Sequence, residues 1–184
     1  MKKGLIALGI FAVFVGIYWF STYNRLITLN EQIDNQWAQV EAQYQRRFDL
    51  IPNLVNSVKG IMRQEQEVFA AIADARTRYS GAATPEDRAA AANQVESALG
   101  RLLVITENYP QLQSSQTVQT LMAQLEGTEN RISVERSRYN DGVGAYNMTV
   151  KRFPGSLIAS LSGFEARTYF EAAETAEEAP AVNF

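Results

Sequence analysis

Four short polar clusters carry the side chains of this sequence that could perform chemistry. They combine carboxylates, guanidinium groups, amides and tyrosine hydroxyls, which can form ion pairs, bind a ligand through hydrogen bonds or act as acid and base. The candidate positions are Arg46, Arg47, Asp49, Pro52, Asn53, Asn56, Lys59, Glu107, Asn108, Glu129, Asn130, Arg131, Tyr139, Asn140, Tyr146 and Asn147. We interpret them as an interaction or structural motif, and we assign no catalytic, cofactor-binding or metal-binding residue.

The composition argues against an enzyme. The chain contains no histidine and no cysteine, which excludes thiolate nucleophiles, imidazole bases and Cys/His zinc sites. A di-iron site of the helical-bundle type needs Glu-x-x-His, and a hydrolase built on carboxylates needs a cleft that a thin bundle hardly provides. We therefore predict a protein without enzymatic activity or cofactors, and the mild net charge of -3 gives no reason to expect a nucleic-acid partner.

The first cluster, residues 45–60, lies within a helical pattern and contains a proline. Pro52 lacks the backbone donor for the carbonyl of Phe48 and crowds that carbonyl, so we expect it to bend the helix. Two interpretations stay open. The cluster is either a solvated helix face, which the periodicity alone favours because charged helix faces are common, or a recognition surface at the bend.

The later clusters also allow a structural and a functional interpretation. Residues 107–110, Glu-Asn-Tyr-Pro, are typical of a helix end. Tyr139 and Asn140 recur as Tyr146 and Asn147 at a seven-residue interval, which places both tyrosines on one helix face. They are either core residues with hydrogen-bonded hydroxyls or a polar ladder that fixes the register between helices or subunits.

The N-terminal segment is apolar enough to cross a membrane. The run at residues 4–20 contains no charged side chain, and about 20 helical residues span a hydrocarbon core of about 30 Å. A cleaved signal peptide is the alternative, but the run ends in Tyr-Trp-Phe at 18–20, where a cleavage site needs small residues. Aromatic residues suit the interfacial belt of a spanning helix, so we predict a retained transmembrane anchor at residues 1–23.

The basic residues around this anchor predict its orientation. Lys2, Lys3 and the α-amino group precede the apolar run, whereas only Arg25 follows it closely. The positive-inside rule then puts the N-terminus in the cytoplasm. The main domain is expected on the periplasmic or extracellular side of a bacterial inner (cytoplasmic) membrane.

The rest of the chain predicts an all-α protein. Apolar residues recur at steps of three and four, as in amphipathic helices, and we expect helices at about 24–79, 84–109, 112–153 and 156–171. The expected architecture is the transmembrane helix continuing into a long-helix antiparallel bundle of three main helices, plus a short C-terminal helix. The bundle covers residues 24–172, and residues 173–184 are interpreted as a disordered acidic tail.

Taken together, the motifs resemble those of the LemA family. They cover almost everything between the end of the anchor and the tail: Tyr23-Asn24, Trp37, QRRFDLIPNLVNSVKG at 45–60, ENYP at 107–110, TENRI at 128–132, YNDGVGAYN at 139–147, FP at 153–154, GF at 163–164 and YFE at 169–171. The resemblance implies a bacterial protein with one N-terminal membrane helix, a helical bundle and no established enzymatic activity. Because the polar clusters coincide with these motifs, it favours their functional interpretation.

Complementary charge suggests how the clusters meet. We expect Arg46 or Arg47 to pair with Glu107 or Glu129 in the folded bundle. Two functions follow from the sequence. The first is a single-pass membrane scaffold that self-associates through its heptad stripe and polar residues, and the alternative is an adaptor that presents the bundle to another membrane protein, such as a protease or transporter. The expected partners are thus the membrane, further copies of the chain and an unidentified membrane protein.

Overall fold

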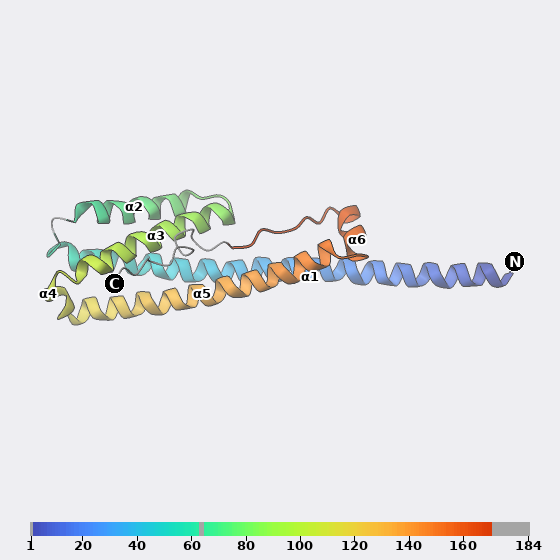
Figure 1. Cartoon of the computed structure of the whole chain (residues 1–184), viewed down its shortest axis with the longest axis horizontal. Coiled ribbons are helices and arrows are strands. Elements are labelled where there is room, and N and C mark those ends of the chain that lie inside the picture. Colours follow the sequence, from blue (N-terminus) through green and yellow to red (C-terminus); the bar gives the residue numbers. More distant parts are fainter. Residues whose placement is uncertain (1, 63–64, 171–184) are drawn as a thin grey trace, which may run out of the picture. The chain divides into compact units, whose positions relative to one another are not determined.

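The structure is a computed structural model that describes residues 2–62 and 65–170. Within these ranges every regular element is a helix, which confirms the all-α prediction. The helices are α1 (Lys2–Lys59), α2 (Gln66–Gly81), α3 (Pro85–Thr106), α4 (Pro110–Gln113), α5 (Gln116–Lys151) and α6 (Gly155–Ser162), labelled in Figure 1. The predicted tail at 173–184 lies outside the described residues. The chain forms two compact units.

One expected helix is two helices in the structure. The sequence predicts a single helix over 24–79, but α1 ends at Lys59 and α2 begins at Gln66. Pro52 does not end the helix, because it lies inside α1. The helix breaks instead at Gly60, a residue with low helix propensity. The amides of Ile61 and Met62 both donate to the Val58 carbonyl, at 2.9 Å each, and close the last turn. Met62 is fully buried, so the apolar periodicity continues through the turn and conceals it in the sequence.

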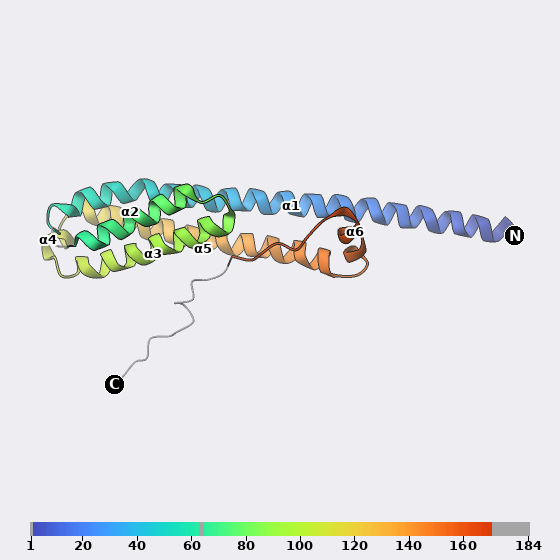
Figure 2. The ribbon, with the colours of Figure 1, turned by 90° about the horizontal axis from the view of Figure 1, so that it is seen from above.

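The larger unit, unit 2, comprises Gln39–Arg136 together with Phe170. It contains the C-terminal part of α1, then α2, α3 and α4, and the N-terminal part of α5. Figure 2 shows α2 and α3 lying side by side and running in opposite directions. The four long segments bury one apolar stripe each, including Val40, Phe48, Ile51, Leu54, Val58, Ile72, Val95, Leu102, Val118 and Ile132.

The helix starts and stops in unit 2 follow local rules. The Thr84 side chain accepts a hydrogen bond from the Asp87 amide at 3.1 Å and caps α3. Pro85 occupies the first helical position, where its missing donor costs nothing. Pro110 opens the short α4 and separates α3 from α5.

Unit 1 comprises residues 2–38 and Ser137–Tyr169. It contains the N-terminal part of α1, the C-terminal end of α5, helix α6 and the non-helical segment that follows α6. Two ring pairs join these pieces edge to face: Tyr23 with Phe164 and Trp37 with Tyr139, each with centroids 5.7 Å apart. The buried residues include Leu26, Ile33, Val143, Tyr146 and Ile158.

The first part of α1 has no protein covering it. α1 is the one helix in the described chain that is long and apolar enough to cross a membrane. None of its most hydrophobic window of 18 residues is buried in the protein. Large apolar side chains there are well exposed, for example Phe11 at 67%, Phe14 at 68% and Phe20 at 69%.

Candidate functional site

The predicted polar residues do not form one surface. Nine of them are exposed: Arg46, Asp49, Asn53, Asn56, Lys59, Glu107, Asn108, Asn130 and Arg131. Pro52, Glu129 and Asn140 are half-buried, and Arg47, Tyr139, Tyr146 and Asn147 are buried. The exposed residues leave the recognition-surface interpretation as a prediction. Of the buried ones, Arg47 and Asn147 belong to two separate polar networks, one in each unit, and Tyr139 packs edge to face on Trp37.

Arg47 of unit 2 is a charged residue whose side chain is almost completely buried. Its side chain is 1% exposed and forms an ion pair with Glu129, one of the pairings expected from the sequence. The guanidinium carbon lies 6.0 Å from the centre of the Tyr44 ring. Burial lowers the pKa of Arg47 to about 10, and the nearby Glu96 carboxylate opposes this shift. Arg47 therefore remains a cation at neutral pH inside the bundle.

A second arginine completes this network. Arg136 donates from Nε and Nη2 to the Tyr44 hydroxyl, at 3.0 and 2.9 Å, and from Nη2 to Asn93 Oδ1 at 2.9 Å. Its Nη2 also lies 3.5 Å from Glu96 Oε2. The Phe170 ring covers the guanidinium group, with the ring centre 4.4 Å away, in a cation–π contact.

These residues form one cluster, which we call the arginine cluster: Tyr44, Arg47, Asn93, Glu96, Glu129 and Arg136. It draws on α1, α3 and α5, and its two cations face two carboxylates. The hydrogen bonds of Arg136 tie α1 and α3 to α5. That buried polar groups of this kind fix the register between helices stays a prediction. Among the described residues there is also no group of three or more acidic side chains that could hold a metal ion.

Four of the six residues of this cluster escaped the sequence analysis. Tyr44, Asn93, Glu96 and Arg136 were not among the predicted residues. A signal for Arg136 exists, because it falls on the buried stripe between Ile132 and Tyr139, where an apolar residue is expected. A charged residue at a position of the buried stripe means either that the stripe was assigned to the wrong helix face or that the charge is buried and paired.

Tyr44 of the arginine cluster and its neighbour Tyr79 both have raised pKa values. Burial raises the pKa of Tyr44, and the neighbouring Arg136 opposes the change. Tyr79 of α2 packs edge to face on Tyr44, with centroids 5.6 Å apart, and its ring is tilted against that of Phe48, with centroids 4.4 Å apart. Burial raises the pKa of Tyr79 to about 12, with a further contribution from the Glu41 charge.

This shift predicts sensitivity to alkali. The unfolded chain releases the Tyr79 proton near pH 10, whereas the folded chain holds it to about pH 12. In that window the folded state binds more protons, so the free energy of unfolding falls as the pH rises. We expect Tyr79→Phe to remove about 1 kcal/mol of this fall, after allowance for solvent screening. Thermal unfolding in detergent, followed by circular dichroism at pH 8 and pH 11, measures the difference, and equal alkaline losses in both proteins contradict the assignment.

The second network lies in unit 1 and centres on Asn147. Its amide nitrogen donates to the Arg167 carbonyl at 2.8 Å, and its amide oxygen accepts from the Arg167 backbone amide at 2.9 Å. The Arg167 side chain donates from Nη2 to Asn30 and to Asp34 of α1, at 2.9 Å each. Arg167, which the sequence analysis missed, thus fastens the segment after α6 to α5 and to α1.

The chain is similar to known bacterial proteins. The LemA family model matches residues 36–184. Two curated relatives, "Magnetosome protein MamQ 1" and "Magnetosome protein MamQ 2" of Paramagnetospirillum magneticum, are each 27% identical over 175 residues, which cover 81% of this chain and 64% of the relative. "Magnetosome protein MamQ" of Magnetospirillum gryphiswaldense is 26% identical over 174 residues, covering 80% of this chain and 64% of the relative. The chain thus spans less than two thirds of these relatives, and neither the family description nor their names denote an enzyme.

Proposed function

Because the chain belongs to the LemA family, we propose that it is a non-enzymatic, single-pass, membrane-anchored helical scaffold that self-associates at the bacterial membrane. The observation that carries the proposal is the uncovered apolar start of α1. Each large apolar side chain left in water costs about 1.5–3 kcal/mol relative to burial, and a bilayer removes this cost for the whole segment. The bacterial relatives named magnetosome proteins support a bacterial setting.

The proposed organisation keeps the anchor at residues 1–23 and the bundle from residue 24 onward. Lys2 and Lys3 support a cytoplasmic N-terminus, with the bundle on the periplasmic or extracellular side of the cytoplasmic membrane. The absence of histidine and cysteine from the sequence supports a role that does not depend on catalysis.

A stripe of small residues on the anchor supports self-association. Gly9, Ala12 and Gly16 are spaced three and four residues apart and therefore share one face of α1. A Cβ added at Gly9 or Gly16 meets nothing within 4 Å in the chain, so this face is open to a neighbour. Small residues let two membrane helices approach closely, which is a main source of helix association in a bilayer.

We expect Ala12→Leu to weaken self-association about tenfold, because a large side chain on the stripe separates the helix backbones. Ala7→Leu is the matched control, since it makes the same change on the opposite face of the helix. Energy transfer between labelled copies in liposomes, measured at several lipid-to-protein ratios, gives both affinities. Equal loss in the two variants, or no loss in either, contradicts the stripe as the contact.

The direct test of the scaffold is the mass of the assembly. The full-length protein is extracted in mild detergent, and its protein mass is measured by light scattering together with single-particle imaging. We expect a discrete particle of many chains. A monodisperse monomer contradicts the scaffold function and favours the adaptor function.

A groove between α1 and α2 favours the adaptor as the second candidate. The groove has a volume of about 550 Å³, and its lining includes Pro52 and Asn56 of the predicted motif and Arg76, Thr77 and Ser80 of α2. Such a mixed apolar and polar groove suits a short segment of another protein. A photo-crosslinker placed at Asn56 in living cells tests this function. Capture of a single membrane protein supports the adaptor, whereas capture of the same chain alone contradicts it.

A further inference from the structure

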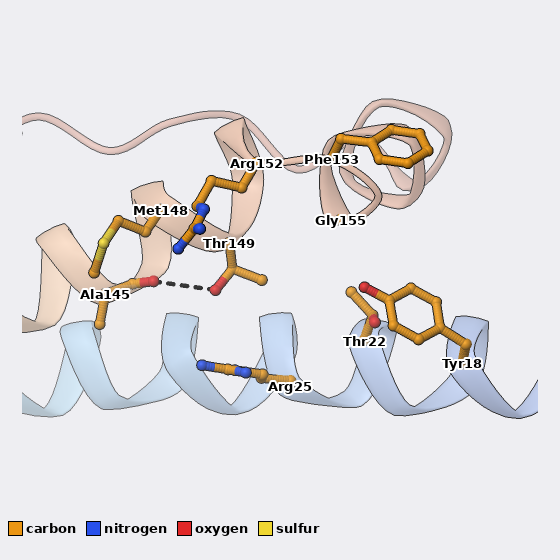
Figure 3. Close-up of a pocket in the computed structure, with 9 residues that line it drawn as sticks. All are labelled: Tyr18, Thr22, Arg25, Ala145, Met148, Thr149, Arg152, Phe153 and Gly155. Carbon is orange, nitrogen blue, oxygen red and sulfur yellow. Dashed lines mark hydrogen bonds between the residues drawn. The ribbon is translucent and has the colours of Figure 1, made fainter.

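A pocket of about 310 Å³ in unit 1 lies where the apolar run of α1 ends. Tyr18, Thr22 and Arg25 line it from α1, and Thr149 and Arg152 line it from the end of α5 and the turn after it. Figure 3 shows the Arg25 side chain lying along α1 and the Arg152 side chain pointing toward α1 from the other segment. The pocket thus joins two cationic groups at the boundary between the apolar and polar parts of α1.

The pocket contains hydrogen-bond donors that could bind an anion, and it contains no acidic side chain that would repel one. None of its lining residues is acidic. In the part of the chain that the structure describes, neither Arg25 nor Arg152 forms an ion pair. The Thr149 hydroxyl already donates to the Ala145 carbonyl at 3.1 Å, which leaves the guanidinium groups and the Tyr18 and Thr22 hydroxyls as donors. A guanidinium group binds a phosphate through two parallel N–H donors, and this pocket offers two such groups.

Helix α6 gives a second, independent indication of a lipid surface. Its Ile158 and Ala159 are buried, whereas Leu157 is 56% exposed and Leu161 is 73% exposed, and Phe153 just before it is 80% exposed. Leu157 and Leu161 are four residues apart and form one exposed apolar stripe on α6, and the exposed Phe153 precedes this helix. A short helix with an exposed apolar stripe suits the surface plane of a bilayer.

The residues that line the pocket place the exposed stripe of α6 next to the end of the apolar run. Phe153 and Gly155, at the start of α6, line the pocket together with Tyr18 and Thr22. The exposed stripe therefore begins beside the last residues of the apolar run, where an anchored chain meets the lipid headgroups. Apolar contacts to acyl chains and cationic contacts to phosphate thus coincide at one depth.

We propose that this pocket binds the phosphate headgroup of an anionic phospholipid, held by Arg25 and Arg152, while Phe153 and the α6 stripe contact its acyl chains. The proposal rests on the membrane anchoring proposed above. Bound lipid at this position fixes the depth of the anchor and the orientation of unit 1 at the bilayer surface.

The test compares lipids that differ in headgroup charge. Full-length protein in an uncharged detergent is titrated with phosphatidylglycerol or phosphatidylcholine of the same acyl chains, and bound lipid is counted by native mass spectrometry. We expect phosphatidylglycerol to bind about tenfold more tightly, and the double variant Arg25→Gln/Arg152→Gln to lose this preference. The control Arg78→Gln/Arg101→Gln removes two exposed charges of unit 2 and is expected to change the preference less than about twofold.

Competition with free phosphate distinguishes a lipid headgroup from a soluble phosphate compound as the ligand of the pocket. Millimolar inorganic phosphate or glycerol phosphate is expected to leave lipid binding unchanged, because neither supplies acyl chains for the α6 stripe. Complete competition by these ions overturns the lipid assignment in favour of a soluble phosphate compound. Equal binding of both lipids, or equal loss in the control variant, overturns the site.

Liposome flotation after an alkaline carbonate wash separates failure of the site from failure of the anchor. Protein that floats but shows no headgroup preference contradicts the pocket and leaves the anchor intact. Protein that is washed off contradicts the anchor, and the lipid site with it. Circular dichroism of each variant confirms that the helices are formed before binding is measured.

Discussion

Replacing Arg47 with alanine is expected to lower the free energy of unfolding by about 3–5 kcal/mol. The side chain is 1% exposed, so its removal leaves a large void in the centre of unit 2. It also removes the ion-pair partner of Glu129. Thermal or denaturant unfolding of the full-length protein in detergent, followed by circular dichroism, measures the loss.

The matched variant Arg47→Met separates packing from charge. Methionine nearly fills the same volume, and Glu129 is 39% exposed, so its carboxylate can turn to water when the cation is gone. We expect Arg47→Met to cost less than about 1.5 kcal/mol, since apolar replacements of buried charges are often tolerated. A loss as large as that of alanine contradicts this account and shows that the charge itself holds the bundle. A loss below 1 kcal/mol for alanine contradicts the burial of the side chain.

The second large effect is expected for Gly155→Ala, which should destabilise unit 1 by about 3 kcal/mol. An added Cβ at Gly155 lies 2.5 Å from the Thr149 carbonyl oxygen, which is backbone and cannot rotate away. The turn from α5 into α6 must therefore shift. Because Gly155 also lines the phospholipid pocket, the variant is expected to disturb the headgroup preference as well.

Gly127→Ala, in the interior of α5, makes the same substitution at an uncrowded glycine and serves as the control. An added Cβ there meets nothing within 4 Å, and alanine in a helix interior is more stable than glycine by about 0.5–1 kcal/mol. The two variants should thus shift the unfolding midpoint in opposite directions. Equal midpoints for Gly155→Ala and the parent protein contradict the close approach of the backbone at this turn.

Residues that act over short sequence distances could be predicted. The capping of α3 by Thr84, the interruption at Pro110 and the uncovered apolar run each depend on neighbours within a few positions. The break between α1 and α2 was missed because buried Met62 preserves the apolar spacing across it. Glycine at position 60 permits a break, but packing decides whether one occurs.

The tertiary structure also places a second cation near the end of the apolar run. The sequence sets Lys2 and Lys3 against Arg25 alone, which predicts the orientation of the anchor. In unit 1 Arg152 lies at the same pocket as Arg25, although it is distant in sequence. A topology prediction based on sequence distance therefore omits a cation on the side of the bundle.

By itself, the sequence determined the helical class, the apolar N-terminal run and the family, because periodicity, length and motif residues are properties of the chain. Only the tertiary structure decided which polar residues work together. Arg46 and Arg47 are adjacent, yet a rotation of about 100° per residue leaves one exposed and buries the other against Glu129. Arg136 reaches Tyr44, 92 positions away, because helix packing sets that contact and sequence spacing does not.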